Sequence, residues 1–214
     1  MSEQQEKLEA LRRAVARIEE GDSAGAVESA PAEPSAERRS SPGGEDSRSD
    51  YEKARAVVLR KLTGSAKSRH QLAESLREKE FSESTIAEIL DRMEEVHLLD
   101  DADFARTWVC TRHELKNLGR SALRRELREK GIEETLAEEA LEQIGAEDED
   151  AAARELVEKK LQGKSLPAGD GPEERKEREK HTRRLVSMLA RRGHSPTAAF
   201  QIVREAMDDH TARP

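Results

Sequence analysis

The feature that most constrains the fold of this chain is a segment that occurs three times. The three copies, which align without gaps, are residues 72–93, 123–144 and 185–206. Each copy begins with two apolar residues one helical turn apart, such as Leu72 and Leu76, and ends with an apolar stripe at positions i, i+4 and i+7. A short break separates the two patterns, so each copy is predicted to fold as a helix, a tight turn and a second helix.

The residues of the break give a chemical reason for the helix boundaries. Gly131 and Gly193 occupy the same position in the second and third copies, where glycine supplies the left-handed conformation that closes a helix. Glu80 takes this position in the first copy. Ser195 and Pro196 then supply an N-cap and a first-turn proline to the last helix.

A further amphipathic segment precedes each copy, and no period-2 alternation is long enough to form a strand. The preceding helices are expected at Glu52 to Leu62, Asp101 to Leu115 and Asp150 to Leu161. We therefore predict an all-α fold of about nine helices in tandem three-helix repeats, at residues 50–99, 100–145 and 146–208. Because one such unit buries little apolar surface alone, neighbours should stack into an elongated, curved body.

Three stretches lie outside this pattern. Residues 1–49 form an acidic extension rich in Pro and Ser, with too few large apolar residues to offset the entropy of ordering, and we expect disorder there. Residues 5–20 could form a short helix within it, which either frays or docks on a partner. Residues 163–180, rich in Gly, Pro and charge, are predicted to be a disordered insertion whose deletion leaves the fold standing, and residues 209–214 a tail.

Composition narrows the classes of function. Only 34% of the residues are hydrophobic and 39% are charged, so most helix surfaces must face water. Cys110 is the only cysteine, which excludes a disulfide within the chain and fits a reducing compartment. With neither a secretory signal nor a membrane-length apolar stretch, we expect a cytoplasmic protein without a membrane partner. The net charge of −8 requires any nucleic-acid contact to use segregated basic surface.

Positive and negative charges are segregated within each repeat: the middle helix is basic and the third helix is acidic. Arg120, Arg124 and Arg128 recur at i, i+4 and i+8 and are predicted to form one exposed ridge. Like charges at this spacing repel by roughly a few tenths of a kcal/mol per pair. The ridge is therefore either a contact surface for a partner or a solvated face that the acidic helices of neighbouring repeats neutralise.

The patterns that could carry chemistry are incomplete. Residues 163–165 (Gly-Lys-Ser) match the end of a phosphate-binding loop, but Glu158 stands where that loop needs glycine, and no strand precedes it. Cys110 and His113 have the spacing of two zinc ligands without a second pair nearby. Trp108 lies on an apolar helix face and is predicted to be a core residue. We expect a protein that is not an enzyme, with no catalytic residues, metal, cofactor or small-molecule substrate.

The stretch LLDDADFARTWVCTRHELKNLGRSALRRELREKGI, residues 98–132, resembles the signature region of the RecX family of recombinase regulators. The positions that carry the resemblance are Leu99, Asp100, Asp101, Phe104, Ala105, Arg112, Gly119, Glu126, Leu127, Lys130, Gly131 and Ile132. The helix at Ala54 to Leu62 and the third repeat also look like the family, so the resemblance covers roughly residues 50–208. The N-terminal extension and the 163–180 insertion lie outside the shared core.

The resemblance implies tandem repeats that lie along the groove of a RecA–DNA filament and limit its ATP hydrolysis, strand exchange and co-protease function. The implied partner is a RecA-class recombinase filament, with DNA contacted weakly or through the filament. Our candidates for contact with partner or DNA are Arg112, Lys116, Arg120, Arg124, Arg125, Arg128 and Lys130. Secondary candidates are Arg69, Arg77, Lys79, Arg183, Arg184, Arg191 and Arg192. The alternatives are a direct DNA-binding repeat protein without recombinase specificity and a helical scaffold for another protein.

Overall fold

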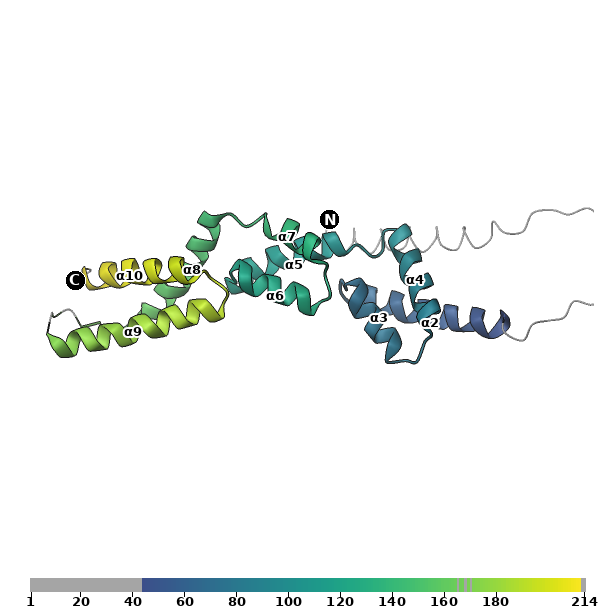
Figure 1. Cartoon of the computed structure of the whole chain (residues 1–214), viewed down its shortest axis with the longest axis horizontal. Helices are drawn as coiled ribbons and strands as arrows, with labels where there is room; N and C mark the ends of the chain where they lie inside the picture. Colours follow the sequence, from purple (N-terminus) through teal and green to yellow (C-terminus); the bar gives the residue numbers. More distant parts are fainter. Residues whose placement is uncertain (1–43, 165, 168, 170, 213–214) are drawn as a thin grey trace, which may run out of the picture. The chain divides into compact units, whose positions relative to one another are not determined.

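A computed structural model describes residues 44–164, 166–167, 169 and 171–212 (Figure 1). The helices are α2 (Gly44–Gly64), α3 (Arg69–Arg77), α4 (Glu83–Glu95), α5 (Asp101–Lys116), α6 (Arg120–Glu129), α7 (Glu134–Leu141), α8 (Ala146–Leu161), α9 (Pro172–Arg191) and α10 (Pro196–Ala212). Over these residues there are nine helices and no strand, so the predicted all-α class is confirmed. The chain divides into two compact units, Met1–Asp101 and Ala102–Pro214.

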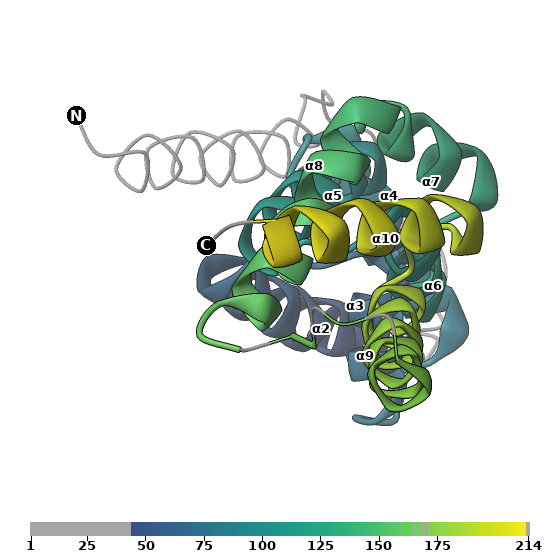
Figure 2. The same ribbon diagram turned by 90° about the vertical axis from the view of Figure 1, so that its left-hand side faces the viewer.

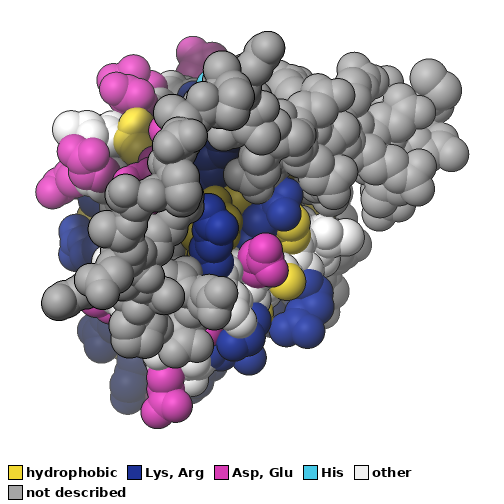
Figure 3. Space-filling model, turned by 90° about the vertical axis from the view of Figure 1, so that its right-hand side faces the viewer, with side chains coloured by type: hydrophobic (Ala, Val, Ile, Leu, Met, Phe, Trp, Pro, Cys, Tyr) yellow, Lys and Arg dark blue, Asp and Glu magenta, His cyan; other side chains and the backbone are white. Residues whose placement is uncertain are grey.

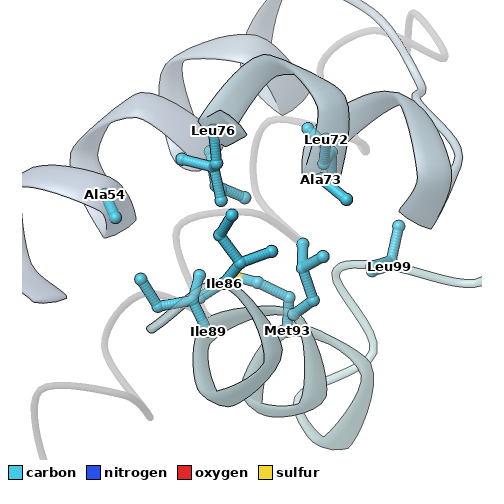
Figure 4. Close-up of a cluster of buried hydrophobic side chains, with 10 residues drawn as sticks. Ala54, Leu72, Ala73, Leu76, Ile86, Ile89, Met93 and Leu99 are labelled. Carbon is cyan, nitrogen blue, oxygen red and sulfur yellow. The ribbon is translucent and has the colours of Figure 1, made fainter. Parts of the chain in front are cut away.

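The first unit holds the first repeat, in which α2, α3 and α4 surround one apolar core (Figure 4). Leu76 of α3 and Ile86 of α4 point toward one another, with Ala54 of α2 beside them. Ser68 caps α3 because its hydroxyl accepts from the N–H of Gln71, whose side chain in turn accepts from the N–H of Ser68. Such a reciprocal cap satisfies two N–H groups that the first turn leaves free, and it starts the helix at this residue.

The second unit holds the second repeat (α5–α7) and the third repeat (α8–α10), each around its own core. The first helix of every repeat buries an alanine and a valine at i, i+4. These pairs are Ala54 and Val58, Ala105 and Val109, and Ala153 and Val157. In the third repeat α10 packs against both α8 and α9, whereas α8 and α9 contact each other much less (Figure 2). That difference leaves space between α8 and α9 for a surface hollow.

The three repeat turns share one backbone conformation. Glu80, Gly131 and Gly193 have φ angles of 65°, 71° and 87°. In each turn the next N–H donates back to the second leucine of the preceding helix, as in a Schellman cap. The donor and acceptor pairs are Phe81 and Leu76 (3.3 Å), Ile132 and Leu127 (3.1 Å), and His194 and Leu189 (3.1 Å). The predicted left-handed glycine positions are therefore confirmed, and Glu80 carries the same conformation without being glycine.

Replacing Glu80 with glycine should stabilise the first repeat by about 1 kcal/mol, because the left-handed conformation costs a residue with a Cβ atom about 1–2 kcal/mol and glycine returns part of this as chain entropy. Amide hydrogen exchange in α3 and α4, followed by mass spectrometry, measures the effect. Glu78→Gly is the matched control, since Glu78 has an ordinary φ of −58° at the end of α3. Faster exchange in Glu80→Gly than in the parent chain would contradict the assigned strain.

The structure corrects three of the predicted segment boundaries. Helix α2 begins at Gly44, so residues 44–49 are helical rather than part of a disordered extension. Helix α9 begins at Pro172, where Gly171 and the proline set its first turn, so residues 172–180 are helical too. Helix α10 continues to Ala212, so residues 209–212 are not a tail. The predicted short helix at residues 5–20 lies outside the described residues.

The 163–180 segment also contributes to packing, contrary to the prediction that it is dispensable. Leu166 is 8% exposed and belongs to the third core. The guanidinium of Arg178 pairs with Asp208 of α10 (2.9 Å). Deleting the segment would remove both contacts and the first turns of α9, so we now expect the deletion to destabilise the third repeat.

Candidate partner-binding surface

Most positions that carry the family resemblance serve the fold. Leu99, Phe104, Leu127 and Ile132 are buried in the cores of the first and second repeats. A carboxylate oxygen of Asp101 accepts a hydrogen bond from the N–H of Arg69, the first residue of α3 (2.8 Å). These residues explain why the pattern specifies tandem repeats. Because they serve the fold, a partner would have to contact other side chains.

Trp108, Arg112 and Glu126 form a network at the edge of the second core. The Glu126 carboxylate accepts hydrogen bonds from Trp108 Nε1 (2.9 Å) and from Arg112 Nε (2.7 Å). Arg112 holds the pKa of Glu126 below its usual range. The Trp108 ring stacks on Phe104, and its centroid lies 5.2 Å from the Arg112 guanidinium carbon and 5.0 Å from Lys130 Nζ. Trp108 is therefore half-buried, and two candidate contact residues, Arg112 and Lys130, lie against it.

The predicted Arg120, Arg124 and Arg128 ridge is not uniformly open. The Arg124 guanidinium forms a bidentate pair with Glu138 of α7, and its Nη2 lies 2.8 Å from Oε2. Arg120 is half-buried, and Arg128 alone of the three is exposed. The turn at Gly131 folds α7 back on α6, which brings Glu138 opposite Arg124. Neutralisation thus comes from the acidic helix of the same repeat.

Three candidates of the second repeat remain open to a partner. Lys116 at the end of α5 and Arg125 and Arg128 on α6 are exposed. Within the described part of the chain, their side chains make no hydrogen bond or ion pair. We call these three the second-repeat cations. They carry positive charge that no carboxylate of the described chain neutralises by contact.

The basic residues of the first repeat are largely paired. Arg69 contacts Asp91 (2.6 Å) and Glu94 (2.7 Å), and Arg77 contacts Glu74 and Glu83 (both 2.7 Å). Lys79 is exposed and makes no such contact among the described residues. Figure 3 shows one face of the molecule, on which coloured Lys and Arg side chains lie beside Asp and Glu. The secondary candidates Arg69 and Arg77 therefore support the helices that they join.

The secondary candidates of the third repeat have mixed surroundings. Arg183 pairs with Glu179 (3.1 Å). Arg184, Arg191 and Arg192 instead line a hollow between α8 and α9. Two further lysines, Lys160 and Lys164, line the same hollow. Lys160 was not a candidate in the sequence analysis, and Lys164 was considered there only within the Gly-Lys-Ser pattern. Lys160 lies in the last turn of α8, and Lys164 lies three residues beyond the end of that helix.

A tight joint connects the second and third repeats, formed by residues 117–119 of the α5–α6 loop and residues 192–194 of the α9–α10 turn. The N–H of Gly119 donates to the carbonyl of Arg192 (2.9 Å), and the Arg192 guanidinium donates to the carbonyl of Lys116. Glu149 of α8 accepts from the N–H of Arg120 (3.2 Å), so a carboxylate of the third repeat caps α6. The joint was not predicted, because its partners are more than 70 residues apart in sequence.

His194 is the buried polar group of this joint, at 4% exposure. Its Nε2–H donates to the carbonyl of Asn117 (3.0 Å), which leaves Nδ1 as the lone-pair nitrogen. Nδ1 lies 3.9 Å from Oε1 of Glu149, a distance at which protonated His194 would form an ion pair. Burial lowers the pKa of His194, against the smaller opposing effects of Asn117 and Glu149. We therefore assign a neutral ring at neutral pH.

The joint should weaken as pH falls. Because burial lowers the folded-state pKa of His194 from 6.5, the unfolded chain binds more protons below about pH 6.5, and unfolding becomes easier there. Urea denaturation followed by Trp108 fluorescence from about pH 8 to about pH 5 measures the effect. His194→Gln keeps an N–H donor without a titrating ring, so its free energy of unfolding should change less over this interval. An equal pH response in both chains would contradict the assignment.

The remaining chemical candidates, Cys110 and His113, have hydrogen-bond partners of their own. The Cys110 thiol donates to Glu114, and this contact raises the pKa of the thiol. His113 Nδ1 lies 2.9 Å from the carbonyl oxygen of Leu118. Over residues 44–212, the described positions contain no cluster of three or more His, Cys, Asp or Glu side chains that could hold a metal ion. No described helix has the length and apolar character that crossing a membrane requires.

The described part of the chain is an all-helical protein of tandem three-helix repeats with a strongly charged surface. Family models for the first and second three-helix domains of RecX match residues 54–93 and 100–141. The chain is 44% identical over 167 residues to the regulatory protein RecX of Streptomyces coelicolor, covering 78% of this chain and 84% of the relative. It is 40% identical over 168 residues to that of Thermobifida fusca, covering 78% and 86%. This chain belongs to the RecX family of regulatory proteins.

Solved structures agree on the fold. The crystal structure of RecX from Lactobacillus salivarius matches with a TM-score of 0.63 at 21% identity, covering 75% of this chain and 98% of that one. A second crystal structure, of a regulatory protein RecX, matches with a TM-score of 0.67 at 20% identity, covering 81% and 82%. At these identities the likeness concerns the tandem three-helix architecture alone.

Proposed function

We propose that this chain binds the filament that a RecA-class recombinase forms on DNA and limits the activity of that filament. Membership of the RecX family carries the proposal, since the family resemblance implies a recombinase partner. The limited activities would be ATP hydrolysis, strand exchange and co-protease function, during recombination and the response to DNA damage. The protein would do this in the cytoplasm by binding, without a reaction of its own.

The charge distribution supports a polyanionic partner. A recombinase filament presents DNA phosphates together with the same protein surface at every protomer. The second-repeat cations, Lys116, Arg125 and Arg128, carry no ion pair within the described chain, so their charge is available to such a surface. Several weak contacts made by one body raise the total affinity by effective concentration. Inhibition would then follow from occupancy of the filament.

The test is DNA-dependent ATP hydrolysis by the cognate recombinase, titrated with this chain below an equimolar ratio. We expect inhibition at these ratios, because a molecule bound along or at the end of a filament affects many protomers. Replacing the second-repeat cations with glutamine should raise the concentration for half-inhibition about tenfold, which corresponds to about 1.4 kcal/mol over the three side chains. Full activity of the recombinase at all ratios would refute the proposal.

A matched control separates the specific contact from the general effect of charge. Arg60, Lys176 and Arg204 are exposed and make no ion pair among the described residues. Changing these three to glutamine removes the same charge from other surfaces, and we expect inhibition close to that of the parent chain. An equal reduction in both triple variants would mean that net charge, rather than the second-repeat cations, determines binding. Arg124 is left unchanged because its pair with Glu138 stabilises the repeat.

Direct nucleic-acid binding is the second candidate function. One observation favours it, namely the hollow in the third repeat lined by Lys160, Lys164 and three arginines. The same titration without recombinase, with labelled DNA alone, distinguishes the two functions.

A further inference from the structure

The hollow between α8 and α9 in the third repeat is strongly basic. It encloses about 430 Å³. Lys160 and Lys164 lie on one side, and Arg184, Arg191 and Arg192 on the other. Leu185 and Met188 also line the hollow, and the described residues of the lining include no carboxylate. The hollow exists because α8 and α9 both pack on α10 but contact each other little (Figure 2).

The cations of this hollow form no ion pair with a carboxylate of the described residues. The side chains of Lys160, Lys164 and Arg184 make no hydrogen bond or ion pair there, and Arg184 has only a longer-range attraction to Glu177, whose pKa it helps to lower. Arg191 donates to the hydroxyl of Ser187 (2.7 Å) and Arg192 to the carbonyl of Lys116, and both acceptors are uncharged. Elsewhere Arg69, Arg77, Arg112 and Arg124 all pair with carboxylates.

Helix termini account for only part of this cluster. Lys160 lies in the last turn of α8, where a cation compensates the negative end of the helix dipole. Arg184 lies well inside α9, more than one turn from the end of the helix at Arg191. The helix dipole therefore does not stabilise a cation at Arg184. Like charges around one concavity cost stability unless an anion occupies it. The hollow therefore has the charge of an anion-binding site.

We propose that this hollow binds successive phosphates of a nucleic-acid strand. Its cations lie on two sides. Lys160, in the last turn of α8, and Lys164, three residues beyond the end of that helix, lie on one side. Arg184 and Arg191 lie on the other, separated by about 10 Å along α9, from the helical rise of about 1.5 Å per residue. Two rows of cations match a linear polyanion, and guanidinium groups bind phosphate oxygens through paired N–H donors.

The apolar lining residues Leu185 and Met188 favour a nucleic-acid strand over an acidic peptide. Leu185 and Met188 offer no hydrogen-bond partner to the N–H and C=O groups that an extended peptide would bury there. Sugar C–H groups of a nucleic acid have no such requirement. Among the described residues, the lining has no aromatic side chain on which bases could stack. Binding should therefore depend on phosphates and salt and show little sequence preference.

This inference rests on the proposed function for its biological meaning, because a strand held by the third repeat would add an attachment point to a recombinase–DNA filament. It concerns residues separate from the second-repeat cations. The test of the hollow uses DNA alone and needs no recombinase. A negative result for DNA binding by the hollow would therefore leave inhibition of ATP hydrolysis untouched, and a negative result for inhibition would leave DNA binding by the hollow untouched.

The test is fluorescence anisotropy of a labelled oligothymidylate titrated with the full chain at a series of salt concentrations. Changing Lys160, Lys164 and Arg184 to glutamine should raise Kd about tenfold. It should also reduce the slope of log K against log salt by about 2, because each phosphate that a cation neutralises contributes about 0.7 to this slope. The Arg60, Lys176 and Arg204 control, which changes the net charge equally, should raise Kd about twofold at most. Circular dichroism and Trp108 fluorescence confirm that each variant is folded.

Two outcomes would overturn the proposal. The first is an equal Kd for the hollow variant and its control, or no binding of the oligothymidylate by the parent chain at low salt. The second comes from a labelled oligoglutamate of the same length used as a competing polyanion. If the hollow variant bound the oligoglutamate more weakly and the oligothymidylate as before, the site would belong to an acidic polypeptide.

Discussion

Gly193→Ala is expected to lower the free energy of unfolding of the second unit by about 3 kcal/mol. The left-handed φ of 87° costs an alanine about 1–2 kcal/mol. A Cβ atom at this position would also lie 2.2 Å from the backbone nitrogen of Ala122 and 2.5 Å from its Cβ, which forces α6 and the turn apart at a further cost of about 1–3 kcal/mol. Urea denaturation followed by the fluorescence of Trp108 measures the loss.

Gly163→Ala is the matched control for this change. Gly163 has a φ of 73°, yet a Cβ atom there would meet nothing within 4 Å. Its alanine variant should lose about 1 kcal/mol from the backbone alone. Amide exchange at Gly119 and Ser121, whose N–H groups donate to carbonyls of the joint, should accelerate in Gly193→Ala and not in Gly163→Ala. Equal losses in the two variants would show that backbone conformation, rather than close approach at the joint, makes Gly193 necessary.

Glu126→Ala is expected to lower the free energy of unfolding of the second unit by about 2 kcal/mol. The side chains of Arg112 and Glu126 are 24% and 19% exposed, and removing one partner leaves the other charge poorly solvated. A fully buried pair loses about 3–5 kcal/mol in this way, and partial exposure reduces the figure. Trp108 Nε1 also loses its acceptor. Denaturation followed by Trp108 fluorescence reports directly on this network.

The pH dependence gives Glu126→Ala a second readout. Arg112 lowers the folded-state pKa of Glu126 from 4.5, so the pair stabilises the fold above about pH 4.5 and this stabilisation is lost as pH falls through the folded value. The parent chain should therefore converge with the variant in acid. Glu129→Ala, an exposed residue of the same helix, should change stability by at most about 0.5 kcal/mol. A difference between Glu126→Ala and the parent that persisted unchanged below the folded pKa would rule out the ion pair as its cause.

The repeats and their turns could be predicted from the sequence because their causes are local. Leu72 and Leu76 occur at helical spacing, and Gly131 and Gly193 follow the last turn of their helices, where the left-handed conformation is required. The same reasoning placed Ser195 as an N-cap, and its hydroxyl accepts from the N–H of Ala198 (3.2 Å). Local composition misled it at residues 172–180, where packing of α9 on α10 outweighs a polar sequence.

The candidate partner-binding surface could be predicted less well from the sequence. Spacing along α6 indicated a basic ridge at Arg120, Arg124 and Arg128, but spacing within one helix contains no information about the helix opposite. Glu138 of α7 pairs with Arg124, and only the fold of the turn brings the two together. Lys160 was not among the candidate residues, and Lys164 was considered only within the Gly-Lys-Ser pattern. Both line the hollow together with three arginines of α9 and its C-terminal turn.

The sequence by itself determined that this chain forms all-helical tandem repeats, where the repeat turns fall, and which family it resembles. Tertiary structure alone decided which charges are neutralised within the chain and which remain for a partner. The physical reason is the distance along the chain between the residues that interact. Helix periodicity and turn conformation depend on residues within one or two turns, whereas an ion pair or a joint such as that of Gly119 with Arg192 depends on side chains and carbonyls that meet only after the helices have packed.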